Sequence, residues 1–313
     1  MGNEADTQVA WQAGKWVDPP SLRLPLEDLG ALQGVSVVDR VRTGVGQPID
    51  LLWHLERFRS GAESLGITLE VDLERLCLEC IERRRAMRSS EDSIGDFSLI
   101  LYATPGVSQS GTTKSAPANL MLYTVDLPIE RMRNFYEHGQ ELVSVERTLV
   151  PSNSWSAQIK TRSRLHYYLG EQEANALVTG AGAVLSTQDG GLGDTSLANL
   201  VVVKDDTLFV APETDVLHGV TLRRILQLSR NDYSSLMQPI TRELAFSAEA
   251  ILCTGTTALL WPVRSLSYMA GSQLEQREWC RAGHNPAYQL LCKRLEEWLG
   301  YDYRKPFASP KQS

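Results

Sequence analysis

Hydrophobic and polar positions in the first half of the chain alternate with the period of strands in some segments and of helices in others. The most sharply patterned segment spans residues 49–66, where Leu51, Leu55 and Phe58 fall on one helix face. The expected elements are a hairpin at 10–17, a strand at 35–41, helices at 49–66 and 73–87, and strands at 97–104 and 118–125.

The second half mixes strands and helices without a regular strand–helix–strand alternation. The expected elements are a strand at 141–148, a helix at 163–177, two strands around 189–191, a hairpin of strands 200–204 and 207–210, a helix at 221–229, strands at 250–254 and near 261–265, and a helix at 286–299. Asp205-Asp206 favours a tight turn inside the hairpin. This irregular order is typical of the α+β class.

A chain of 313 residues is long enough for two domains. We place the boundary near Pro128, which follows the second of two adjacent strands. The expected division is a small N-terminal domain at 1–126, a linker at 127–132, a larger C-terminal domain at 133–302 and a poorly ordered tail at 303–313.

Charge and composition exclude several classes of protein. The 38 acidic and 31 basic side chains give a net charge of −7, which argues against a nucleic-acid partner. We expect a cytoplasmic protein with no membrane association, because no apolar stretch is long enough to span a bilayer. Cys77 and Cys80 fall on an apolar helix face and no histidines stand at zinc-site spacing, so we interpret them as buried residues rather than metal ligands.

Lys160 stands at the end of an extended segment, after the apolar Ile159 and just before a predicted helix. A lysine held at such a junction beside apolar groups can act as a nucleophile. A lysine whose stem packs on the surface and whose amine reaches water gives the same pattern.

Three further segments have features of phosphate-binding sites. Residues 219–221 open a helix, residues 254–257 follow a strand with hydroxyls and a glycine, and Arg57 lies on a helix that otherwise points apolar groups inward. Each also has a structural explanation, namely a helix cap, a turn and a surface arginine.

The order of these motifs resembles that of the class IV (fold-type IV) pyridoxal-phosphate enzymes. This family contains branched-chain aminotransferases, D-amino-acid aminotransferases and aminodeoxychorismate lyase. The resemblance covers nearly the whole chain, through residues 11–17, 54–58, 159–161, 193–200, 218–221 and 256–257. It implies a two-domain fold with a small α/β N-terminal domain and a larger pseudo-barrel C-terminal domain.

The resemblance also implies roles for individual residues. Lys160 would form a Schiff base with pyridoxal 5′-phosphate and then move the proton between Cα and C4′. Asp194, where the family usually has glutamate, would keep the pyridinium nitrogen protonated, and Asn199 would support its loop. Arg164 stands where many members have a tyrosine near the phenolic oxygen of the cofactor. The phosphate would be bound by Arg57, Val220, Thr221, Thr256 and Thr257.

The resemblance also implies that substrate-binding residues lie on the strand at 35–41 and just beyond it. By alternation Val38, Arg40 and Arg42 share one face, and the resemblance places residues of this face against the substrate. The family's usual Phe-Glu pair is Val38-Asp39 here, and the arginine that D-amino-acid enzymes carry in a Thr-Arg-Gly segment is replaced by Pro105. We expect Arg40 or Arg42 to bind a substrate carboxylate in its place. The alternative is that both are solvated strand residues.

The function favoured by these features is a homodimeric aminotransferase that transfers an amino group between an amino acid and a 2-oxo acid. A lyase that eliminates pyruvate from an aminodeoxychorismate-type substrate is an alternative, since Arg164 and the sequence 198–200 are similar to that enzyme. A third possibility is a family member that has lost turnover, which the departures at Val38, Asp39, Pro105 and Asp194 favour.

Overall fold

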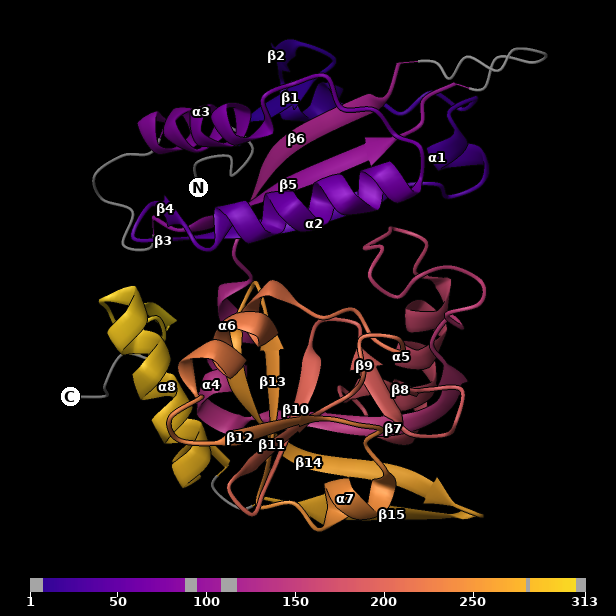
Figure 1. Cartoon of the computed structure of the whole chain (residues 1–313), viewed down its shortest axis with the longest axis vertical. Helices are drawn as coiled ribbons and strands as arrows, with labels where there is room; N and C mark the ends of the chain where they lie inside the picture. Colours follow the sequence, from indigo (N-terminus) through magenta and orange to yellow (C-terminus); the bar gives the residue numbers. More distant parts are fainter. Residues whose placement is uncertain (1–7, 88–94, 108–116, 280–281, 308–313) are drawn as a thin grey trace. The chain divides into compact units, whose positions relative to one another are not determined.

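The structure is a computed structural model that describes residues 8–87, 95–107, 117–279 and 282–307. It divides into two compact units, the first formed by Met1–Leu127 with Ile159–Ser163 and the second by Pro128–Gln158 with Arg164–Ser313 (Figure 1). The first division along the chain falls after Leu127. Ile159–Ser163 differs from expectation, because it belongs to the first unit although it lies far beyond the linker in sequence.

The first unit is built on a six-stranded antiparallel sheet with the order β2-β1-β6-β5-β3-β4. Its strands are β1 (Ala10–Gln12), β2 (Lys15–Val17), β3 (Val37–Gly44), β4 (Gln47–Pro48), β5 (Phe97–Thr104) and β6 (Asn119–Asp126). The hairpin expected at 10–17 is confirmed, and Gly14 supplies the positive φ of 86° that its turn requires.

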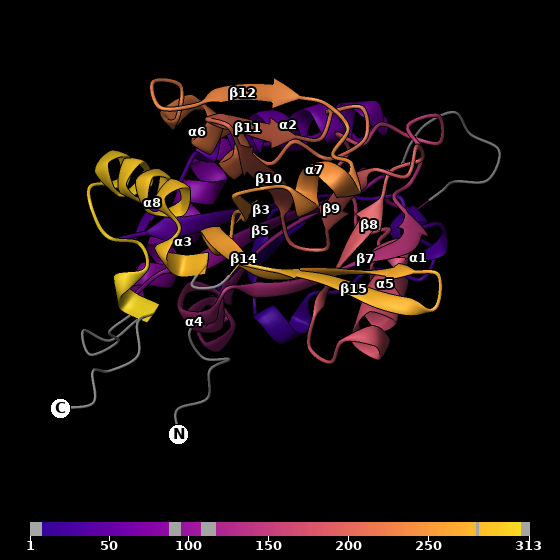
Figure 2. The ribbon, with the colours of Figure 1, turned by 90° about the horizontal axis from the view of Figure 1, so that it is seen from below.

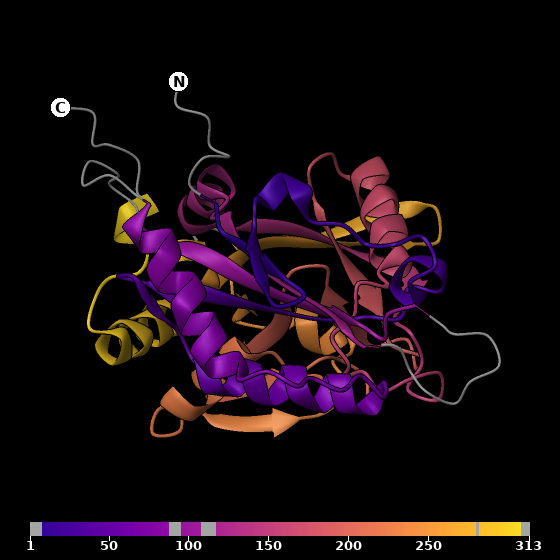
Figure 3. The ribbon, with the colours of Figure 1, turned by 90° about the horizontal axis from the view of Figure 1, so that it is seen from above.

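Two helices, α2 (Leu51–Ser64) and α3 (Leu73–Ala86), pack on one face of this sheet, and a short α1 (Leu29–Leu32) precedes β3 (Figure 3). Leu55 and Phe58 of α2 and Cys77 and Cys80 of α3 are fully buried in the core that the helices form with the sheet. The interpretation of the two cysteines as buried helix residues is therefore confirmed, and their pattern reflects packing against the strands.

The second unit contains a nine-stranded mixed sheet with the order β12-β11-β10-β13-β14-β7-β8-β9, and β15 pairs with β14. Its strands are β7 (Gln140–Thr148), β8 (Gly182–Ser186), β9 (Leu192–Thr195), β10 (Asn199–Lys204), β11 (Thr207–Val210), β12 (Ser234–Met237), β13 (Ala250–Gly255), β14 (Leu259–Ala270) and β15 (Gln273–Glu278). The long β14 pairs in parallel with β7 and antiparallel with β15 (Figure 2). Asp205 and Asp206 both have positive φ, which confirms the tight turn of the β10–β11 hairpin.

Five helices accompany this sheet. They are α4 (Ile129–His138), α5 (Leu165–Leu177), α6 (Val220–Leu228), α7 (Arg242–Phe246) and α8 (Pro286–Leu299). The bounds of α8 match the expectation because both of its ends have clear signals: Asn285 accepts hydrogen bonds from the first amides and Gly300 takes a left-handed conformation. Within the described ranges, no helix combines the length and the apolar character needed to cross a bilayer.

The expectation of a poorly ordered tail beginning at Tyr303 is wrong for the first part of that segment. Tyr303 is fully buried, its hydroxyl donates to the Leu260 carbonyl at 3.0 Å, and its ring packs edge-on against Tyr136. Phe307 is buried as well and also contacts Tyr136. The Lys and Pro content suggested disorder, but two aromatic side chains bury enough apolar area to hold the segment against its unit.

Candidate active site

Asp194 is held by a neighbouring amide inside the second unit. Asp194 lies in β9, and Asn199 begins β10 five residues later. The Asn199 Nδ2 donates to Asp194 Oδ1 at 2.8 Å and to the Leu217 carbonyl at 2.6 Å, and its Oδ1 accepts from the Gly219 amide at 2.9 Å. One side chain therefore connects the acid to the start of α6.

The start of α6 presents backbone donors. Gly219 precedes the nine-residue helix in an extended conformation, and no side chain in the described part of the molecule caps the first amides of this helix. An uncapped helix N-terminus attracts anions through these amides and the helix dipole. A Cβ on Gly219 would lie 2.6 Å from Asn199 Oδ1, so this close approach requires glycine.

The predicted segment 254–257 begins at the end of β13, next to the segment that carries Asp194 and Asn199 in the same unit. In the register of β10 and β13, Asn199 pairs with Thr254. A Cβ on Gly255 would lie 2.5 Å from the Leu197 carbonyl, in the loop that joins β9 to β10. The Oγ1 of Thr254 is buried and has no hydrogen-bond partner among the described residues. The residues around Asp194, the start of α6 and the end of β13 are therefore brought together, as the motif order suggested.

Arg164 is the residue before α5, and its guanidinium donates to the Ser196 carbonyl. It also stacks on the ring of Tyr167, 4.2 Å from the centroid. Burial raises the pKa of Tyr167 well above its usual value, and the nearby Asp194 carboxylate raises it further. The sequence analysis missed Tyr167, although its place one helical turn after Arg164 puts both side chains on one face of α5.

Lys160 lies in the first unit, beside β3. The Val38 amide donates to the Lys160 carbonyl at 2.8 Å. The residues that follow are held in the same way, since the Arg162 amide donates to Ser36 Oγ at 3.2 Å and Ser163 Oγ donates to the Gly34 carbonyl at 2.7 Å. These bonds fix the backbone of Lys160 against the strand that carries the predicted substrate residues.

Arg57 is not a surface arginine. Its Nε donates to Asp39 Oδ2 and its Nη2 to Asp39 Oδ1, both at 2.8 Å, and its side chain is only 13% exposed. His54 Nδ1 lies 2.8 Å from the same Asp39 Oδ1, and both Asp39 and His54 are buried. Burial tends to raise the pKa of Asp39, but the Arg57 charge, His54 and their hydrogen bonds outweigh it and hold this pKa well below its usual range. Burial lowers the pKa of His54, which favours the neutral ring.

Val38, Arg40 and Arg42 lie in β3, where alternation separates them from Val37 and Val41 in the helix-covered core. Arg40 is half-buried and its Nη1 donates to Ser98 Oγ at 3.3 Å. Arg42 is 1% exposed. The interpretation of Arg42 as a solvated strand residue is therefore wrong, because its whole side chain is removed from water.

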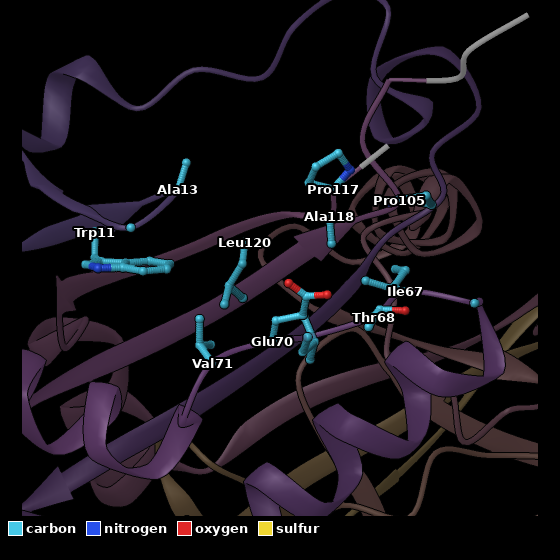
Figure 4. A pocket seen from close by; sticks show the side chains of 13 residues that line it. Trp11, Ala13, Ile67, Thr68, Glu70, Val71, Pro105, Pro117, Ala118 and Leu120 are labelled. Carbon is cyan, nitrogen blue, oxygen red and sulfur yellow. The ribbon is translucent and has the colours of Figure 1, made fainter. Parts of the chain in front are cut away.

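A cavity of about 540 Å³ lies elsewhere in the first unit, between β1, β6 and the segment that joins α2 to α3. Figure 4 shows the carboxylate of Glu70 among the apolar side chains of Trp11, Ile67 and Leu120. None of the site residues expected from the sequence lines this cavity.

The sequence profile described as "Amino-transferase class IV" matches residues 36–266. The chain belongs to this family. A putative branched-chain-amino-acid aminotransferase of Methanocaldococcus jannaschii is 23% identical over 255 residues, which are 80% of this chain and 85% of the relative. A D-alanine aminotransferase of Staphylococcus aureus is 24% identical over 262 residues, or 81% and 87% of the two chains.

Solved structures of class IV enzymes share the fold. A branched-chain aminotransferase of Thermoproteus uzoniensis with norvaline superposes with a TM-score of 0.76 at 20% identity, covering 95% of this chain and 96% of the other. An aminotransferase of Brucella abortus bound to pyridoxal phosphate gives a TM-score of 0.77 at 17% identity, covering 94% and 99%. The expected fold-type IV architecture is confirmed. Membership of the family also confirms the expectation of a pyridoxal-phosphate aminotransferase.

Proposed function

We propose that this class IV aminotransferase holds pyridoxal phosphate through Lys160 and transfers an amino group between an amino acid and a 2-oxo acid. The observation that carries the proposal is the Asn199 side chain, which ties the Asp194 carboxylate to the uncapped start of α6. A carboxylate suits a protonated ring nitrogen, and free amides with nearby threonine hydroxyls suit a phosphate. The acceptor at Asp194 and the donors at the start of α6 therefore fit the two charged ends of this cofactor.

When bound, pyridoxal phosphate supplies an aldehyde and an electron-withdrawing ring that acidifies the substrate Cα–H bond. Lys160 Nζ would attach the cofactor through that aldehyde and, once displaced by the substrate amine, would carry the proton between Cα and C4′. Asp194 would keep a proton on the ring nitrogen, and Asn199 would hold the carboxylate in place. Arg164 would place positive charge near the phenolic oxygen.

The phosphate would be bound by donors of three kinds. Arg57 would supply a planar cation, the start of α6 would supply amides, and hydroxyls would complete the set. The residues assigned to it are Arg57, Val220, Thr221, Thr256 and Thr257. The buried Oγ1 of Thr254, which has no hydrogen-bond partner in the described ranges, lies next to this set in sequence and supports a polar ligand at the end of β13.

For the substrate we propose that Arg42, with Arg40 and Val38 on the same face of β3, binds a carboxylate. The almost complete burial of Arg42 supports this role, because a guanidinium in surroundings of low dielectric constant attracts a carboxylate more strongly than one in water. We further propose a cytoplasmic homodimer, as the family resemblance implies. Light scattering of the purified protein tests the dimer.

The central test is covalent trapping. Protein purified with excess pyridoxal phosphate is reduced with borohydride, digested and mapped by mass spectrometry, with Lys160→Ala as the control. We expect a phosphopyridoxyl group on Lys160 in the wild type and none in the variant. Colourless protein with an unmodified Lys160 peptide would overturn the proposal.

A second assay separates the possible reactions. Purified enzyme is offered a panel of amino donors with and without a 2-oxo acid, and the amino acid product is measured. Transamination requires both substrates. Pyruvate released from an aminodeoxychorismate-type substrate alone would establish the lyase, and trapped cofactor without either product would indicate a member that has lost turnover.

A further inference from the structure

Asp39 is an acidic residue on the core face of a strand. It lies between Val37 and Val41 of β3, which both belong to the apolar core under α2 and α3. A carboxylate in such a place costs folding free energy unless it is paired and fully hydrogen-bonded. His54 and Arg57, three residues apart on α2, supply the partners, so a charged cluster lies inside an otherwise apolar layer.

The way Asp39 binds Arg57 leaves one edge of the guanidinium unused. Both hydrogen bonds are on the side of Nε and Nη2, and neither uses Nη1. A guanidinium is planar and its five N–H donors are fixed in that plane, so two parallel bonds set both its position and its rotation. The third nitrogen therefore has a defined direction.

His54 fixes the carboxylate in turn. Its Nδ1 lies 2.8 Å from Asp39 Oδ1, the oxygen that also accepts from Arg57 Nη2. With a neutral ring, Nδ1–H donates to this oxygen. The nearby Nη2 of Arg57, 3.4 Å away, is then a neighbouring donor rather than a partner of the ring. His54 thereby restrains rotation of the carboxylate about its last bond.

We propose that Asp39, braced by His54, is a positioning residue for the cofactor's phosphate: it holds the Arg57 guanidinium side-on so that the Nη1 edge is presented to the phosphate. This inference rests on the proposed function, in which Arg57 binds that phosphate. The simpler alternative is an ion pair that stabilises the packing of α2 on β3 and has no effect on phosphate recognition.

The experiment compares the affinity for pyridoxal phosphate with that for pyridoxal, which lacks the phosphate. Both dissociation constants are measured by absorbance titration of cofactor-free wild type, Asp39→Asn, Arg57→Ala and the double variant. Asparagine replaces one acceptor oxygen by an NH₂ group, which cannot accept a hydrogen bond from Arg57. The guanidinium is then held by one hydrogen bond instead of two, and its orientation is no longer fixed. We expect Asp39→Asn to weaken pyridoxal phosphate binding about tenfold, the effect of impairing one charged hydrogen bond. Pyridoxal binding should be unchanged.

The double variant tests whether Asp39 acts through Arg57. If it does, Asp39→Asn causes no further loss of phosphate preference once Arg57 is alanine. Asp232→Asn is the matched control, because Arg294 donates to Asp232 through Nε and Nη2 in the same two-bond geometry, at 2.8 Å each. This control should leave the ratio of the two dissociation constants at its wild-type value.

The possible results separate the two proposals. A wild type that binds both ligands equally, or an Arg57→Ala variant that keeps the preference for pyridoxal phosphate, overturns the role of Arg57. Loss of the preference in Arg57→Ala but not in Asp39→Asn overturns the positioning role alone. Should Asp39→Asn be unfolded without denaturant, His54→Ala takes its place: a reduced preference supports the inference and an unchanged preference overturns it.

Discussion

Replacing Asn199 with alanine should have an unusually large effect for a single polar residue, because its buried side-chain amide makes three hydrogen bonds. It donates to Asp194 Oδ1 at 2.8 Å and the Leu217 carbonyl at 2.6 Å, and accepts from Gly219 at 2.9 Å. Asn199 is only 6% exposed, so water replaces these bonds poorly. A bond to a carboxylate contributes about 1.5–3 kcal/mol and each of the two neutral bonds about 1 kcal/mol, so the variant should lose about 3.5–5 kcal/mol of unfolding free energy.

The loss is measured by urea unfolding of the cofactor-free protein, followed by tryptophan fluorescence. Asn285→Ala is the control, because Asn285 caps α8 by accepting from the amides of Ala287 and Tyr288 at 3.0 and 3.3 Å. Removal of such a cap costs about 1 kcal/mol. The second readout is the dissociation constant for pyridoxal phosphate, which should rise about tenfold in Asn199→Ala. The reason is that Asp194 is no longer held in place and its charged hydrogen bond to the ring nitrogen is weakened. It should not change in Asn285→Ala.

The reasoning fails if the two variants lose similar unfolding free energy and both bind pyridoxal phosphate like the wild type. In that case Asn199 would contribute no more than an ordinary helix cap. A loss of stability with unchanged cofactor affinity would refute the link between Asn199 and the cofactor, while leaving its structural role intact.

Three further predictions concern other parts of the molecule. Arg42→Ala should raise the KM for a dicarboxylate amino donor about tenfold with a smaller change in kcat, as measured by steady-state kinetics. If neither Arg42→Ala nor Arg40→Ala changes this KM, the carboxylate binds elsewhere. Gly219→Ala should lower the unfolding free energy by about 1–3 kcal/mol because its Cβ meets an amide oxygen at 2.6 Å, whereas Gly95→Ala, which meets nothing, should be neutral in the same urea assay. Because the pKa of Asp39 is held below its usual range, its stabilising effect should be present above a pH of about 4 and fall as the pH drops further. The difference in urea midpoint between wild type and Asp39→Asn should therefore shrink in acid, and a constant difference would contradict the paired carboxylate.

Local features of the sequence determined much of the fold. The helix at Pro286–Leu299 has a capping asparagine before it and a glycine after it, and its apolar positions repeat at the helical period. The β10–β11 hairpin follows from Asp205-Asp206 between two β-branched runs. These features depend on residues close together in the chain, and so the sequence alone specified them. The order of short motifs was likewise sufficient to indicate the family.

Long-range contacts decided the rest, since the pattern of one segment does not say which distant segment it meets. Lys160 belongs to the first unit because Val38 donates to its carbonyl across more than a hundred residues. Tyr303 is ordered because it packs on Tyr136 rather than because of its neighbours in sequence. In the sequence, Asp39 was only a departure from the Phe-Glu pair that is usual in the family. The tertiary structure revealed that it is a buried carboxylate, stabilised by His54 and Arg57 of α2.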